Sequence, residues 1–285
     1  MLRRVTCLLL LTSSIAFAQD QVVTLAGREV SIWKPSGSGR APLVIYSHGY
    51  GGCPTQPGYL LRALANNGYW VVSVRHGDAG CGRRRTPAST RNVSFSDPST
   101  WNENTFIDRR NDVHAIEAAL RIDARFRTRI DFSRYAYAGH SLGGYTAVAL
   151  AGGWRSWAGS TSPSAVLALC PYLVPFIEQK SLANIRAPIM FQGGSLDARI
   201  TRALQRKGGA YDLATDAKYL VVFRNASHLT WGGRDNPTHD DIVEYAVAFL
   251  DRYVKGEPAA HVLTSVGDLA DFRYDSELGR RDGEH

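Results

Sequence analysis

The hexapeptide Gly139–Gly144 limits the possible folds of this chain more than any other stretch. Its sequence, Gly-His-Ser-Leu-Gly-Gly, follows a β-prone run at Arg134–Ala138 and precedes an alanine- and leucine-rich run at Tyr145–Ala151 that is typical of a buried helix. A tight turn from strand to helix leaves no room for a Cβ beside the serine and exposes its hydroxyl at the sheet edge. The pattern predicts that Ser141 is a nucleophile; the alternative is an ordinary glycine-rich turn that opens a helix.

Apolar strand-like segments alternate with helix-like segments along most of the chain. Strands are predicted at Val22–Leu25, Glu29–Trp33, Leu43–Ser47, Trp70–Val74, Arg134–Ala138, Ala165–Leu169, Ile189–Gln192 and Lys218–Phe223. Helices are predicted at Tyr59–Asn67, Asp112–Leu120, Tyr145–Ala151 and about Asp240–Val254. Strands that are apolar on both faces and separated by helices indicate an α/β fold with a mostly parallel central sheet, here of about eight strands, and helices on both faces. Active sites in such sheets lie beyond the carboxyl ends of the strands.

The first residues have the three parts of a secretory signal peptide. Arg3 and Arg4 form the basic region, Leu8–Leu11 the centre of the apolar region, and Ala16–Ala18 a small-x-small cleavage site. We therefore expect a signal peptide over 1–18, cleavage near Ala18, and an exported protein that is periplasmic or secreted. The remaining residues, 19–285, are predicted to form a single catalytic domain. No apolar run is long enough to span a membrane.

The net charge of the chain bears on whether it binds nucleic acid, and the positions of its cysteines bear on disulfide and metal bonding. Loss of two arginines with the signal peptide lowers the formal net charge from +7 to +5, and no recognition motif accompanies this mildly basic balance, so no nucleic-acid partner is predicted. Cys53 and Cys81 fall in loops that leave consecutive predicted strands, whereas Cys170 ends an apolar strand. We expect a Cys53–Cys81 disulfide and a buried Cys170 thiol; three free thiols are the alternative. No cysteine and histidine spacing resembles a zinc site, and no metal or organic cofactor is predicted.

A nucleophilic serine needs a base that takes its proton. In strand–turn–helix folds of this kind the acid and then the histidine follow the serine in the chain. His228 comes directly after the predicted strand Lys218–Phe223 and therefore lies at the catalytic edge, whereas His239 and His261 lie at the start of the last helix and beyond it. His228 is the predicted base.

The base in turn needs a carboxylate that holds its ring in the right tautomer. Asp197 follows the predicted strand Ile189–Gln192 through a short loop that opens at the same edge. Asp212 and Asp216 are the rivals, but they lie in a helical or polar segment that leads into the next strand, where solvated carboxylates are common. Asp197 is the predicted acid.

The oxyanion of the reaction needs two preorganised donors. We assign one to the backbone N–H of Leu142 and the other to the backbone N–H of Tyr50, in the glycine-rich loop His48–Gly52 that follows a predicted strand. A purely structural turn is the alternative for that loop. The substrate is predicted to contact the Tyr50 ring and His140, which precedes the nucleophile.

The segment from Gly77 to Asn104 breaks the regular alternation, because it is long, polar and rich in Gly, Pro, Ser and Arg. It leaves the carboxyl end of a strand, so we consider it a partial lid over the serine. Trp101 and the arginines Arg83–Arg85 are then candidates for substrate contact. A solvated loop without substrate contact is the equal alternative.

Taken in chain order, these motifs resemble the α/β-hydrolase superfamily over nearly all of residues 19–285. The resemblance rests on the segments Ser47–Gly52, Leu64–Tyr69, Gly139–Gly144, Gly194–Asp197 and Ala226–His228. The chain looks most like an exported group that includes dienelactone-hydrolase-like proteins, platelet-activating-factor-acetylhydrolase-like proteins and cutinase-type polyesterases, and Arg109–Asp112 is similar to that group. True dienelactone hydrolases use a cysteine nucleophile where this chain has Ser141.

The resemblance implies an exported serine hydrolase that cleaves small-molecule or polymeric carboxylic esters through an acyl-enzyme. The nearest alternative is a peptidase or amidase with the same machinery. A non-catalytic binding protein with this fold is the alternative from another class, and its expected mark is a missing member of the serine, aspartate and histidine set; none is missing here.

Overall fold

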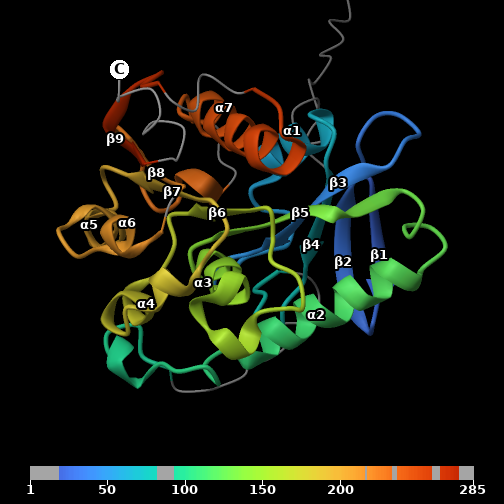
Figure 1. The fold of residues 1–285 in the computed structure, drawn as a ribbon, viewed down its shortest axis with the longest axis horizontal. Helices are drawn as coiled ribbons and strands as arrows, with labels where there is room; N and C mark the ends of the chain where they lie inside the picture. Colours follow the sequence, from blue (N-terminus) through green and yellow to red (C-terminus); the bar gives the residue numbers. More distant parts are fainter. Residues whose placement is uncertain (1–18, 82–92, 216, 233–235, 259–263, 276–285) are drawn as a thin grey trace, which may run out of the picture.

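A single nine-stranded sheet forms the centre of the protein in the computed structural model, which describes residues 19–81, 93–215, 217–232, 236–258 and 264–275. The sheet order is β1-β2-β4-β3-β5-β6-β7-β8-β9 (Figure 1). In chain order the strands are β1 (Gln21–Leu25), β2 (Arg28–Trp33), β3 (Ala41–Ser47), β4 (Trp70–Val74), β5 (Ile130–His140), β6 (Ala165–Leu169), β7 (Ile189–Gly194), β8 (Lys218–Phe223) and β9 (Leu269–Asp275). Strands β3 to β8 are parallel, and the β1–β2 hairpin and β9 add antiparallel edges.

The sheet has one strand more than the sequence analysis predicts. All eight predicted strands are present, and β5 begins at Ile130, four residues earlier than expected. The additional strand, β9, has the sequence Leu-Ala-Asp-Phe-Arg-Tyr-Asp, and most of its residues are only half-buried. Because β9 pairs with β8 on one side alone, it lacks the continuous apolar run that marks the interior strands.

Helices cover both faces of the sheet. They are α1 (Gly58–Asn66), α2 (Ile107–Ile122), α3 (Leu142–Val148), α4 (Val174–Glu178), α5 (Ala198–Gln205), α6 (Ala210–Leu213) and α7 (His239–Leu250). Figure 1 shows α1 and α7 together on one face and α2 and α3 on the other. The buried apolar residues form one hydrophobic core. This is the arrangement of the α/β-hydrolase fold, as the sequence predicts.

Two predicted helices end differently from the expectation. The predicted segments Tyr145–Ala151 and Asp240–Val254 begin as α3 and α7 and finish as π-helical turns, at Ala149–Gly153 and Asp251–Lys255. Gly152 has φ 116°, a conformation that favours glycine and ends the first of these turns.

In the part of the chain that is described, no helix combines the length and the apolar character needed to cross a membrane.

Parallel pairing brings the carboxyl ends of β3, β5, β6, β7 and β8 to one edge of the sheet. The segments that leave these ends begin at His48, Ser141, Cys170, Ser195 and Arg224. The predicted signal peptide 1–18, part of the 77–104 segment with Arg83–Arg85, and the rival residues Asp216 and His261 lie outside the described residues.

Candidate active site

Ser141 occupies a strained turn between a strand and a helix. Strand β5 ends at His140 and α3 begins at Leu142. Ser141 between them has φ 56° and ψ −116°, backbone angles that residues other than glycine rarely adopt. A Cβ on Gly139 would lie 2.2 Å from the Gly143 carbonyl oxygen, and a Cβ on Gly143 only 1.8 Å from the Ser47 carbonyl oxygen. Both glycines are therefore required by close backbone packing, as the glycine pattern of the sequence predicts.

The structure brings Ser141, His228 and Asp197 into one chain of hydrogen bonds. Ser141 Oγ lies 3.0 Å from His228 Nε2, and His228 Nδ1 lies 2.6 Å from Asp197 Oδ2. Burial alone would raise the pKa of Asp197, but hydrogen bonds from His228 and Cys170 hold it below its usual value. An ionised Asp197 accepts a hydrogen bond from the Nδ1–H group, which leaves Nε2 unprotonated and able to accept a hydrogen bond from the serine hydroxyl.

The rivals of these residues lie elsewhere. His239 begins α7, where its ring stacks on Tyr59 and its Nε2 bonds the Thr230 carbonyl oxygen at 2.8 Å. Asp212 lies in α6 and accepts a hydrogen bond from the Gly208 backbone N–H. In the described part of the chain, neither side chain forms a hydrogen bond with Ser141, whose Oγ pairs with His228.

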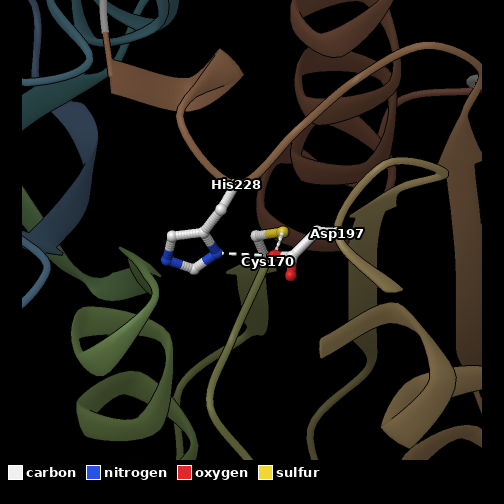
Figure 2. A group of neighbouring side chains, drawn as sticks. All are labelled: Cys170, Asp197 and His228. Atoms are coloured by element: carbon white, nitrogen blue, oxygen red, sulfur yellow. Dashed lines mark hydrogen bonds and ion pairs between the residues drawn. The ribbon is translucent and has the colours of Figure 1, made fainter. Parts of the chain in front are cut away.

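Cys170 is a neighbour of Asp197 that sequence reasoning placed only as a buried thiol. It follows β6 with φ 43° and is fully buried, and its Sγ lies 3.0 Å from Asp197 Oδ2 (Figure 2). Burial raises the pKa of the thiol, so the protonated S–H donates to the carboxylate. The position of Cys170 at the end of the strand between β5 and β7 is the signal that points to this contact.

Cys170, Asp197 and His228 also form a group whose potential metal-ligand atoms all lie within 4.8 Å of one another. Hydrogen bonds already join these atoms through Asp197 Oδ2. A metal at this point would have to replace the His228–Asp197 hydrogen bond. The same atoms therefore cannot bind a metal and relay a proton at the same time.

The predicted oxyanion donors flank the serine. A Cβ on Gly49 would lie 3.4 Å from Ser141 Cβ, so the turn before Tyr50 packs directly on Ser141. Leu142 is the first residue of α3, and its N–H points out of the helix at the end that carries partial positive charge. Among the described residues, neither the Tyr50 nor the Leu142 backbone N–H has a hydrogen-bond partner.

A cavity of about 260 Å³ opens above Ser141. Its lining includes Tyr50, His140, Ser141, His228, Leu229 and Trp231. The Tyr50 and Leu229 side chains are 53% and 70% exposed, so the mouth of the cavity presents apolar surface.

His140 also lies at this cavity, in contact with His228. Its Nε2 lies 3.0 Å from the backbone oxygen of His228. Burial and the neighbouring His228 lower the pKa of His140 to about 3, so the ring is neutral and its Nε2–H donates to that oxygen. His140 therefore helps to hold the loop that carries His228.

Trp101 does not line the cavity, which corrects the expectation that it contacts substrate. It is 1% exposed, and its ring packs among Phe95, Phe106, Tyr145 and Tyr172. The sequence did not predict this aromatic cluster because the 77–104 segment is mostly polar. The cluster packs residues 93–104 against the rest of the protein. The Phe95 ring in turn lies 5.7 Å from the Tyr50 ring, centroid to centroid.

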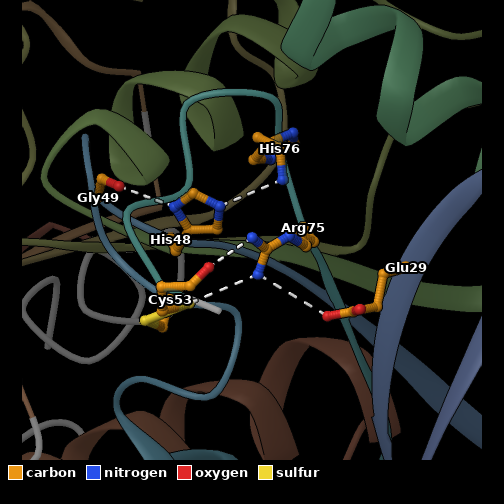
Figure 3. The surroundings of a disulfide bond; sticks show 7 residues. Glu29, His48, Gly49, Cys53, Arg75 and His76 are labelled. Atoms are coloured by element: carbon orange, nitrogen blue, oxygen red, sulfur yellow. Dashed lines mark hydrogen bonds and ion pairs between the residues drawn. A yellow bond between two sulfur atoms is a disulfide. The ribbon is translucent and has the colours of Figure 1, made fainter. Parts of the chain in front are cut away.

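Cys53 and Cys81 form the predicted disulfide, with their Cα atoms 5.6 Å apart. It joins the loop that follows β3 to the loop that follows β4, close to His48 and His76 (Figure 3). The Arg75 guanidinium binds the Cys81 carbonyl oxygen and lies 3.8 Å from Glu29 Oε1. The disulfide therefore ties the glycine-rich loop His48–Gly52 to the loop that follows the neighbouring strand β4.

Comparison with known proteins gives weak similarity to cutinases. The chain is 26% identical to cutinase est1 of Thermobifida alba over 228 residues, which are 79% of this chain and 64% of the relative. It is also 26% identical to cutinase est2 of the same organism, over 79% of this chain and 63% of that relative. The chain thus spans slightly less than two thirds of the length of these relatives. No family model matches it. Similarity to cutinases is compatible with the α/β-hydrolase fold described above.

Proposed function

We propose that the protein is a serine hydrolase that cleaves carboxylic esters through an acyl-enzyme. The observation that carries the proposal is the hydrogen-bond chain from Ser141 through His228 to Asp197 at the base of an open cavity. The weak similarity to cutinases supports the ester class of substrate over the amide class.

The geometry favours a two-step acyl transfer. Ser141 Oγ attacks the ester carbonyl carbon while His228 Nε2 takes the hydroxyl proton, and the N–H groups of Tyr50 and Leu142 stabilise the oxyanion. Collapse of this intermediate breaks the bond to the alcohol oxygen, which leaves with the proton from His228. Water then attacks the acyl-serine, again giving its proton to His228, and the carboxylic acid departs as Ser141 recovers its proton.

Asp197 and the turn geometry lower the energy of the charged intermediates. The imidazolium that forms during each step lies 2.6 Å from the Asp197 carboxylate, which is nearly withdrawn from water because its side chain is 11% exposed. The amino-terminal end of α3 lies at the serine, where its dipole favours a developing negative charge. Neither feature requires a cofactor.

The mouth of the cavity supports an apolar ester as substrate. Tyr50 and Leu229 expose apolar surface beside Ser141, and the cavity is open rather than enclosed by the described residues. We infer that an acyl or alcohol chain lies against these two side chains, as a small ester or as a segment of a polyester. The signal-peptide pattern over 1–18 and the Cys53–Cys81 disulfide support an exported enzyme.

Hydrolysis of p-nitrophenyl esters of increasing acyl length, with a p-nitroanilide of the same acyl group, tests this proposal. We expect turnover of the esters, and Ser141→Ala should lower kcat at least roughly 10⁴-fold, as loss of the nucleophile does in such enzymes. A fluorophosphonate probe should label the protein at Ser141. Ser133→Ala, in an exposed serine on the same strand, is the matched control and should keep both activity and labelling. Labelling that survives in Ser141→Ala would refute the assignment, and faster cleavage of the anilide than of the ester would make the protein an amidase.

A further inference from the structure

The peptide group between Gly49 and Tyr50 carries the proposed oxyanion donor, and its orientation is held from the side opposite the substrate. A trans peptide is planar, and its C=O and N–H point in opposite directions. Whatever binds the Gly49 carbonyl oxygen therefore sets the direction of the Tyr50 N–H. Residues that bind the Gly49 oxygen from behind the loop therefore control the geometry of the proposed oxyanion hole, although they do not line it.

Three donors converge on the Gly49 carbonyl oxygen. His48 Nδ1 lies 2.8 Å from it, the Gly52 backbone N–H donates to it at 3.0 Å, and Arg109 Nη2 lies 3.5 Å away. The His48 ring is thus the nearest side-chain donor. A donation from Nδ1 requires the neutral tautomer that carries its proton on that nitrogen.

The surroundings of His48 select that tautomer. His48 is 1% exposed, and its other nitrogen, Nε2, accepts a hydrogen bond from the backbone N–H of His76 at 3.2 Å (Figure 3). Because an N–H donor faces Nε2, the ring proton must lie on Nδ1. Burial and the charge of Arg109 also lower the pKa of His48 to about 2, so the ring stays neutral.

A second layer keeps His76 and the turn in place. The His76 ring is held between Asp112 Oδ2 at 3.0 Å and Ser47 Oγ at 3.1 Å. Arg109 is fully buried; its Nη1 donates to the His48 carbonyl oxygen at 2.7 Å, and its Nη2 donates to Asp78 at 2.7 Å. A buried ion pair with unpartnered atoms, here Arg109 Nε and Asp78 Oδ1, contributes little to stability, which favours a role in fixing geometry.

We propose that His48 is a positioning residue for the oxyanion hole: its Nδ1–H holds the Gly49 carbonyl and so keeps the Tyr50 N–H aimed at the oxyanion. The inference rests on the proposed function and adds a role to a histidine that precedes the nucleophile and is not its base. His48 touches neither the proton relay nor the reacting oxygen.

Two substitutions of similar size separate this role from a general packing role. The amide nitrogen of Asn takes roughly the place of Nδ1 in a histidine, whereas the amide of Gln reaches the place of Nε2. His48→Asn therefore keeps a donor for the Gly49 oxygen and loses the link to His76. His48→Gln keeps an acceptor for the His76 N–H and loses the donor.

The decisive readout compares an ester with the matching thionoester, in which sulfur replaces the carbonyl oxygen. Sulfur is a weaker hydrogen-bond acceptor, so the thionoester gains less from the oxyanion hole. We expect His48→Gln to lower kcat/KM for the ester about 30-fold and for the thionoester less than about 3-fold, since loss of one full donor costs about 10²- to 10³-fold. His48→Asn should stay within about 5-fold of the unmodified enzyme on the ester.

The alternatives give other results. Equal losses on both substrates in His48→Gln, or a larger ester loss in His48→Asn than in His48→Gln, would overturn the inference. So would unchanged ester kinetics in both variants. Thermal unfolding of each variant checks that the protein is folded. If the unmodified protein has no ester hydrolysis that depends on Ser141, the proposed function fails first; if it has, only the role of His48 is in question.

Discussion

At the scale of single residues, one oxygen atom joins two side chains that the sequence keeps far apart. Asp197 Oδ2 accepts hydrogen bonds from His228 Nδ1 and from Cys170 Sγ. The second donor lowers the pKa of the carboxyl and restricts its rotation, so Cys170 helps to hold Asp197 for His228. A thiol in this place differs from the ordinary buried cysteine, which serves only as a small apolar side chain.

Replacement of Cys170 tests this link. Cys170→Ala leaves Asp197 Oδ2 with one donor, and we expect kcat to fall about 3- to 10-fold because one net hydrogen bond contributes about 1 kcal/mol. Cys170→Ser restores a donor and should recover most of that loss. The pH–rate profile of kcat for the two variants and the unmodified enzyme is the measurement. Equal activity in Cys170→Ala and the unmodified enzyme would show that the thiol only fills space.

At the scale of elements, the turn at Ser141 between β5 and α3, here called the elbow, and the glycine-rich loop His48–Gly52 are held by backbone contact as much as by side chains. Strand β3, the elbow and α3 approach so closely that a Cβ at Gly143 would overlap the Ser47 carbonyl oxygen. The Gly80 N–H donates to the Gly52 carbonyl oxygen at 3.1 Å, next to the Cys53–Cys81 disulfide. These contacts explain why the glycine-rich loop holds one shape.

Two glycine substitutions test the packing of the elbow. Gly143→Ala places a methyl group 1.8 Å from the Ser47 carbonyl oxygen, so the strand or the helix must shift. We expect a loss of more than about 3 kcal/mol in the free energy of unfolding, the upper range for single substitutions, together with loss of esterase activity. Gly39→Ala, with no atom within 4 Å of the new methyl group, is the control and should change neither. Urea denaturation and ester hydrolysis measure both. A stable, active Gly143→Ala would contradict the packing described.

At the scale of the whole molecule, buried neutral histidines couple stability to pH. His48 and His76 are each 1% exposed. Burial lowers the pKa of His76 far below its usual value and that of His48 to about 2. As the pH falls below about 6.5, the unfolded chain takes up protons on these rings before the folded one does. Their contribution to stability is therefore complete above that pH and is lost progressively toward the folded pKa.

The free energy of unfolding should consequently decrease between pH 6.5 and pH 4.5. Each such histidine contributes a slope of up to about 1.4 kcal/mol per pH unit, whereas His114, whose pKa is raised by its hydrogen bond to Glu117, acts in the opposite direction. Comparison of the unmodified protein with His48→Asn isolates one group, and the variant should show a slope smaller by about that amount. Denaturant unfolding at several pH values measures this, and identical slopes would show that His48 has the same pKa in the folded and the unfolded protein.

The alternation of apolar runs was enough to predict the fold class, because interior parallel strands must be apolar on both faces. It was not enough for β9, whose residues are half-buried at an edge, or for the short helices α4, α5 and α6. The expected ends of β4, β6 and β8 match the structure, since each is a mainly apolar run in which only Ser73 and Lys218 are polar.

The sequence by itself was enough to predict the nucleophile turn and the order of acid and base, because both follow from chain direction in a parallel sheet. Only the tertiary structure shows that the Cys170 thiol contacts Asp197 and that Trp101 is buried in the aromatic cluster. It also shows that His48, His76 and Arg109 lie behind the Gly49 carbonyl group. The physical reason is that hydrogen bonds between side chains depend on distances of a few ångströms across the fold, and residues up to 61 positions apart meet behind this one turn. A linear pattern records which groups are present, whereas packing decides which of them share an oxygen atom.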